Sequence, residues 1–121
     1  MAGVVATVFL VVPLRAHHSI LPFDRTHPIE IRGEVVAFQW RNPHTYIDVR
    51  VSDGKASVVW VVEADSPRML ESLGWNKSSL AAGQKVVITG APARDGSPSL
   101  LCQNVVPAGG QSLPCLPQAQ Q

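Results

Sequence analysis

The chain has 121 residues and 45% hydrophobic content, which fits one domain with a single core. Ten Lys and Arg side chains stand against nine Asp and Glu side chains, a formal charge of +1, so the basic surface of a duplex-binding protein is missing. Strong binding to nucleic acid is therefore not expected. The abundant valine favours β-strands over helices, and no internal repeat is visible.

The first sixteen residues have the pattern of a secretory signal peptide. An apolar run extends from Val4 to Leu14, and Ala16 follows as a small residue before a polar segment. The run is shorter than the about 20 apolar residues that cross a bilayer. We expect cleavage after Ala16, a periplasmic or secreted protein, and no membrane span after processing. The alternative is that the run forms a buried N-terminal strand.

From Ile29 onward the sequence alternates with the period of two residues that is typical of strands. Apolar residues take odd positions up to residue 35 and even positions from 36 to 40, so we expect one long strand that bends near Gly33 or carries a bulge. Residues 47–51 alternate again and predict a half-buried second strand. Asp53-Gly54 predicts the turn that follows it.

Residues 56–64 are almost continuously apolar, as expected for a third strand that is covered on both sides. Ser66-Pro67 predicts the start of one short helix, and Gly74 marks its end. Residues 85–90 and 100–106 predict two further strands, joined by a hairpin at Asp95-Gly96. The predicted core consists of the apolar positions of matching parity, which are Ile31, Val35, Ile47, Val49, Val51, Val58, Trp60, Val62, Leu70, Leu73, Val86 and Ile88.

These elements follow the order βββαββ in an all-β domain with one short helix. A bent first strand and a helix between the third and fourth strands match a five-stranded OB-like barrel, in which curling of the sheet removes most of the exposed edge. An open β-sandwich with the same strand count is the alternative. We divide the chain into a signal peptide (1–16), a lead segment (17–28), the barrel (29–106) and a Pro- and Gln-rich tail (107–121) that we expect to be mobile.

Cys102 and Cys115 are the only cysteines, and neither a C-x-x-C pair nor the Cys/His spacing of a zinc site is present. In an exported chain they permit one disulfide that ties the tail to the last predicted strand. Two unpaired thiols remain the alternative, because the sequence does not show whether the two residues lie close together.

Several short motifs occur together in this chain. They are His17-His18-Ser19 directly after the apparent signal peptide and Trp40-Arg41-Asn42-Pro43-His44 at the end of the first predicted strand, with Trp60, Glu63 and Gly74-Trp75 further on. Through them, residues 16–98 resemble a family of small exported bacterial proteins of unknown function. The resemblance implies export and a small β-rich domain, and it implies no activity, substrate or site.

No catalytic constellation is complete, since the chain has no G-x-S-x-G elbow, P-loop or G-x-G-x-x-G segment. We therefore expect a non-catalytic binding domain whose partner is a protein, a glycan or a small molecule. OB barrels often hold ligands with aromatic side chains. Trp40 and Tyr46 flank a turn and are the candidates for a ligand face, whereas Trp60 and Trp75 are most simply parts of the core.

The histidines predict a metal site as the alternative function. Cleavage of the signal peptide makes His17 the N-terminal residue, whose amine and imidazole can chelate one metal ion, with His18 beside it and His44 available from the turn. Nitrogen ligands of this kind suit Cu(II), and also Zn(II) or Ni(II). Cleavage one residue earlier would place a histidine third and give a square-planar site.

Two further residues have a weaker connection to this site. His27 could be an additional ligand but has no spacing argument of its own, and we expect Glu63 to face solvent at the end of the third predicted strand. The alternative to the whole site is that adjacent histidines at a flexible N-terminus bind nothing specifically.

Overall fold

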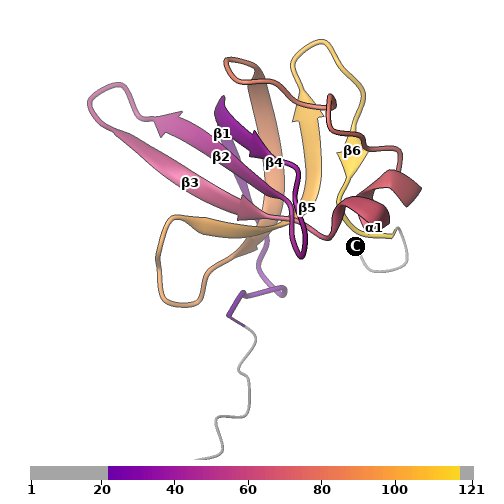
Figure 1. The fold of residues 1–121 in the computed structure, drawn as a ribbon. Helices are drawn as coiled ribbons and strands as arrows, with labels where there is room; N and C mark the ends of the chain where they lie inside the picture. The colour runs from indigo at the N-terminus through magenta and orange to yellow at the C-terminus, as the bar shows by residue number, and fades with distance from the viewer. Residues whose placement is uncertain (1–21, 118–121) are drawn as a thin grey trace, which may run out of the picture.

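The computed structural model describes residues 22–117, so the predicted signal peptide, His17, His18 and residues 118–121 lie outside the described range. Within it, the elements follow the order β1-β2-β3-α1-β4-β5-β6 (Figure 1). This order confirms the predicted βββαββ sequence and adds the short strand β6. The bounds are β1 Ile29–Gln39, β2 Tyr46–Ser52, β3 Ser57–Glu63, α1 Pro67–Ser72, β4 Lys85–Pro92, β5 Ser99–Pro107 and β6 Leu113–Pro114.

Strand pairing closes the first five strands into a barrel. The strands lie in the order β3-β2-β1-β4-β5-β6, and β3 also pairs with β5. This last pairing is parallel and involves Val61 to Glu63 of β3, whereas the other pairings are antiparallel. The result is a mixed five-stranded barrel of the OB type with one extra strand, so the barrel prediction is confirmed over the open sandwich.

Strand β1 belongs to both halves of the barrel. Its residues from Ile29 to Glu34 pair with β4, and those from Glu34 to Gln39 pair with β2. The register with β2 shifts by one residue between Val35 and Ala37, which identifies a bulge at this point. The change in parity along the sequence therefore has the physical cause predicted for it.

Gly33 lies just before this bulge, where β1 passes very close to β2. A Cβ atom at this position would collide with the backbone carbonyl of Arg50 and would lie 2.8 Å from the side chain of Val49. The two backbones can therefore approach this closely only because residue 33 has no side chain.

The core fills the barrel interior and confirms most of the predicted set. Val51, Trp60 and Leu73 are only partly buried, although they pack against the core. Val58 is 48% exposed, so its assignment to the core is wrong. The buried residues from the predicted set are Ile31, Val35, Ile47, Val49, Val62, Leu70, Val86 and Ile88, and the core also contains Leu80, Leu100, Cys102 and Val105.

The prediction that the third strand is covered on both sides is also wrong. Val58, Val59 and Val61 are each at least 40% exposed. Only the last three residues of β3 pair with β5, so the first half of the strand forms an open margin of the barrel. A continuous apolar run indicates burial on both faces only where a second layer covers the strand, and none does so in the described part of the chain.

The predicted helix signals act as expected. The Ser66 hydroxyl accepts a hydrogen bond from the Met69 amide at 3.3 Å, and Pro67 occupies the first helical turn. Leu70 on the inner face of α1 is fully buried, as is appropriate for a helix that packs against the barrel core. No helix within residues 22–117 is long and apolar enough to cross a membrane.

The tail is structured further than expected. β6 pairs with β5, and Cys115 forms a disulfide with Cys102 across a Cα–Cα distance of 5.7 Å. The indole nitrogen of Trp75 donates a hydrogen bond of 2.7 Å to the carbonyl of Pro114. The ordered contacts with the barrel therefore continue at least to Cys115, and the paired alternative for the two cysteines is the correct one.

We expect reduction of the Cys102–Cys115 disulfide to lower the free energy of unfolding by about 3 kcal/mol, because the bond closes a loop with a sequence separation of 13 residues. Guanidinium chloride unfolding with and without a reductant measures this difference. A Cys102→Ala, Cys115→Ala double variant serves as the control, since its stability must not respond to the reductant. Equal stability of oxidised and reduced parent protein would contradict the expected role of the bond.

Candidate functional site

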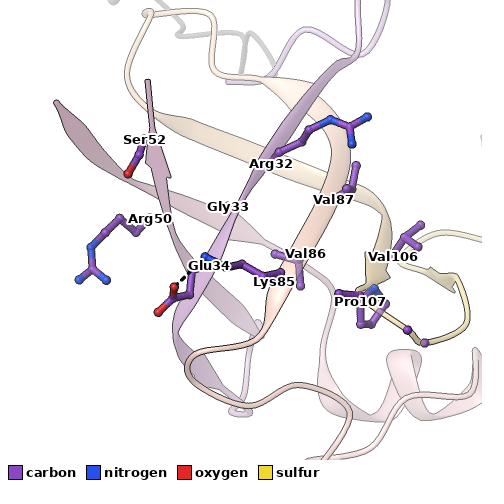
Figure 2. A pocket seen from close by; sticks show the side chains of 13 residues that line it. Arg32, Gly33, Glu34, Arg50, Ser52, Lys85, Val86, Val87, Val106 and Pro107 are labelled. Atoms are coloured by element: carbon purple, nitrogen blue, oxygen red, sulfur yellow. Dashed lines mark hydrogen bonds and ion pairs between the residues drawn. The ribbon is translucent and has the colours of Figure 1, made fainter. Parts of the chain in front are cut away.

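Two hollows of the described surface carry charged side chains. The larger one, here called the β1 groove, has a volume of about 580 Å³ and crosses β1 at Gly33 (Figure 2). The smaller one, the His44 pocket, has a volume of about 230 Å³. The β1 groove is lined by the charged residues Arg32, Glu34, Arg50 and Lys85, by the apolar residues Val86, Val87, Val106, Pro107 and Ala108, and by Gly33, Ser52, Gly109 and Gly110.

Strand register places two rows of side chains in the β1 groove. In the first row, Glu34 of β1 lies opposite Arg50 of β2 and Lys85 of β4. In the second row, Val87 of β4 lies between Arg32 of β1 and its partner Val106 on β5. Figure 2 shows Gly33 between the two rows.

Two of the three cationic side chains that line the β1 groove form ion pairs. Lys85 Nζ lies 3.0 Å from Glu34 Oε2. Arg32 Nη2 lies 2.6 Å from an oxygen of Glu30, which is outside the groove. The guanidinium of Arg50 is exposed and has no hydrogen-bond or ion-pair partner within residues 22–117. One positive charge of the groove is thus left for a molecule that enters it.

The His44 pocket forms where the loop after β1 meets the end of β3. His44 Nδ1 lies 2.7 Å from Glu63 Oε1, and the Glu63 side chain is only 24% exposed. The backbone beside the pair is held by hydrogen bonds that join Thr45 to Ala64 and Asp65. The expectation that Glu63 faces solvent is therefore wrong. Its carboxylate occupies one ring nitrogen of His44 and leaves Nε2 for another contact.

The lead segment runs along the end of β4 and brings Arg25 to the His44 pocket. The Asp24 amide donates a hydrogen bond of 2.8 Å to the carbonyl of Pro92. The Asp24 carboxylate accepts hydrogen bonds from the hydroxyl and amide of Thr26 and contacts His27 Nδ1 at 2.9 Å. These contacts, led by the Thr26 hydroxyl, lower the pKa of Asp24 well below its ordinary value, so the turn is held by a charged carboxylate.

The predicted metal ligands are only partly within the described range. His17 and His18 lie outside it, while His44 is paired with Glu63 and half exposed. His27 is exposed and bound to Asp24, and it does not line the His44 pocket. Within residues 22–117, no three His, Cys, Asp or Glu side chains are grouped so that they could hold a metal ion. Binding of Cu(II) stays a prediction.

Trp40 and Tyr46, which were predicted to form a ligand face, lie in two different environments. The ring of Trp40 lies 5.7 Å from that of Phe38 and packs against the core. Tyr46 is covered by the Arg41 guanidinium, 5.3 Å from the ring centroid. Both aromatic residues are half-buried, and neither lines the β1 groove or the His44 pocket.

The charged residues of the β1 groove did not emerge as a site from the sequence. The alternation along β1 does place Arg32 and Glu34 on the face opposite the core, and Gly33 between them signals a close approach of another strand. The alternation does not show which residues of the neighbouring strands lie opposite Arg32 and Glu34. Only the pairing of β1 with β2 and β4 brings Arg50 and Lys85 to this place.

Comparison with known protein families covers most of the barrel. Among curated protein sequences, none matches this chain. The profile of one protein family matches residues 6–101, a range that contains both Gly33 and His44 and ends within β5, before Cys102. This match confirms the resemblance to an uncharacterised family. The chain belongs to the family of unknown function DUF6152.

Proposed function

We propose that the protein is exported and acts outside the cytoplasm as a non-catalytic binding domain that holds its ligand in the β1 groove. The groove itself carries this proposal. Its volume of about 580 Å³ falls within the range of about 300–1,000 Å³ that is common for small-molecule sites. It also combines apolar wall residues with a few charged groups, the usual composition of such sites.

The construction of the groove supports a preformed site. Its floor consists of four neighbouring strands, β2, β1, β4 and β5, whose backbones are hydrogen-bonded to one another. Val86 and Pro107 are buried beneath it and fix the sheet at this point. A rigid floor favours binding because little conformational entropy is lost when the ligand enters.

The chemistry of the groove supports binding rather than proton transfer. The guanidinium groups of Arg32 and Arg50 offer hydrogen-bond donors and no acceptor, which suits contact with an anion rather than the removal of a proton. The carboxylate of Glu34 is held by Lys85 at 3.0 Å. These side chains are suited to orienting a charged or polar group of a ligand.

Two features support export. The N-terminal sixteen residues have the pattern of a signal peptide that ends at Ala16. The disulfide between Cys102 and Cys115 is of the kind that forms and persists in oxidising compartments outside the cytoplasm.

We expect the protein recovered from the periplasm of an expressing bacterium to begin at His17 and to carry a small molecule, both of which native mass spectrometry measures. A Val106→Trp variant should lose that molecule, because the indole would fill the groove from a valine that is 37% exposed on β5. Val59→Trp is the matched control, since Val59 is a similarly exposed valine of β3 outside the groove.

An unprocessed chain in the cytosolic fraction would contradict export. Equal loading of the parent protein and Val106→Trp would contradict binding in the β1 groove.

The contact between His44 and Glu63 favours a second candidate function, the binding of a transition-metal ion. A carboxylate that holds one ring nitrogen of a metal-binding histidine orients the other nitrogen toward the metal. Arg25 of the lead segment lines the same pocket. The eight residues from His17 to Asp24, which precede Arg25, can extend over at most about 28 Å, so the processed N-terminus is within reach of His44.

For this second candidate, we expect the processed chain to bind one Cu(II) through His17 together with His18 or His44. Binding should weaken as the pH falls, because protons compete for the nitrogen ligands. Isothermal calorimetry should show weaker binding for His17→Ala and for His44→Ala, and a loss of about 10- to 100-fold for Glu63→Gln. His27→Ala is the control and should bind like the parent. Unchanged affinity of both His17→Ala and His44→Ala would exclude the site.

A further inference from the structure

We propose that the β1 groove selects an elongated apolar molecule with a single carboxylate group, of the size of a medium-chain fatty acid. This inference rests on the proposed function and adds the chemical class of the ligand. The carboxylate lies at Arg50, and the apolar part extends over Gly33 to Val87 and Val106.

Arg50 provides the polar end of the site. It is the cation of the groove whose guanidinium has no ion-pair partner within residues 22–117. Ser52 lies two residues further along β2, so its side chain leaves the same face of the strand and lines the groove with Arg50. A guanidinium fork binds both oxygens of a carboxylate, and a neighbouring hydroxyl can donate a further hydrogen bond.

The charge pattern favours one negative charge over two. Lys85 is neutralised by Glu34, and Arg32 is neutralised by Glu30. After these pairs form, the groove retains the single positive charge of Arg50. The carboxylate of Glu34 lies opposite Arg50 in the strand register and would repel a second negative charge. A carboxylate therefore fits this end better than the dianion of a phosphate ester.

Val87 and Val106 provide the apolar end. They lie opposite each other on neighbouring strands and face outward, and Val106 is 37% exposed. Ala108 continues this apolar surface just after β5, above the buried Pro107. Water is released when a hydrocarbon chain covers such a surface, which favours binding of an apolar ligand.

The distance between the two ends indicates an elongated ligand. β2 and β5 are separated by β1 and β4, which corresponds to three strand spacings, or about 14 Å. In Figure 2, Arg50 lies on one side of Gly33 and Val87 and Val106 lie on the other. A ligand in the groove crosses the backbone of β1 at Gly33, between the outward side chains of Arg32 and Glu34.

Sodium decanoate is the direct probe, and amide chemical shifts of the exported protein report where it binds. We expect saturable shifts at Gly33, Val87 and Val106. Acetate, which lacks the apolar part, should cause none. Decanol, which lacks the charge, and decyl phosphate, which can carry a second charge, should each bind about tenfold more weakly than decanoate.

A variant of the polar end tests the assignment of Arg50. Arg50→Gln should lower the affinity for decanoate about tenfold and leave the affinity for decanol unchanged, because only the charge-assisted contact is removed. Arg68→Gln is the matched control, since Arg68 is an exposed arginine of α1 that does not line the groove.

Two outcomes would overturn the inference while leaving binding in the β1 groove intact. One is tighter binding of decanol or decyl phosphate than of decanoate, with shifts at the groove. The other is saturation of the groove only by a peptide with a free C-terminus, which would make the partner a protein. If none of the four probes shifts the amides of the β1 groove, the inference about the ligand class fails. The proposed function is tested independently, because it predicts that Val106→Trp loses the co-purified molecule.

Discussion

The close approach of two backbones at Gly33 is the constraint on which the barrel depends. β1 must pair with β4 on one side and with β2 on the other, and at Glu34 it pairs with both. A side chain at residue 33 would collide with the carbonyl of Arg50. Without this contact, β2 could not reach β1 at this point, and β3 could not follow it to the parallel pairing with β5 that closes the barrel.

Both candidate sites follow from the course of β1. At its first half, the contact at Gly33 brings Arg50 beside Glu34 and creates the β1 groove. At its second half, the bulge after Val35 turns the large apolar residues toward the core. The loop that follows then carries His44 to Glu63 at the end of β3. The β1 groove at the middle of β1 and the His44–Glu63 pair beyond its end thus both depend on the course of one strand.

The features that could be predicted from the sequence are local. Alternation identified the strands, the change in parity identified the bulge, and Ser66-Pro67 identified the start of the helix, because each signal depends on neighbouring residues. The features that were missed depend on contacts between distant residues. Lys85 and Glu34 are 51 residues apart, and the pairing of His44 with Glu63 depends on how a loop meets the end of β3.

The exposure of Val59 and the order of the tail were missed for the same reason. An apolar run does not show whether another layer covers it, and a Pro-rich segment does not show that Cys115 is bonded to the barrel. In this chain, strand pairing brings charged residues that are far apart in the sequence to one groove. The alternation within a single strand does not show which strands lie beside it.

Equilibrium unfolding of a Gly33→Ala variant, followed by tryptophan fluorescence, tests the central constraint most directly. A loss of at least about 2 kcal/mol is predicted, because the added methyl group would force two paired backbones apart. Gly110→Ala is the control. The nearest atom to its added Cβ is a ring carbon of Pro107 at 3.3 Å, so the stability of this variant should change far less. A Gly33→Ala variant as stable as the parent protein would show that the close approach of β1 and β2 does not hold the barrel together.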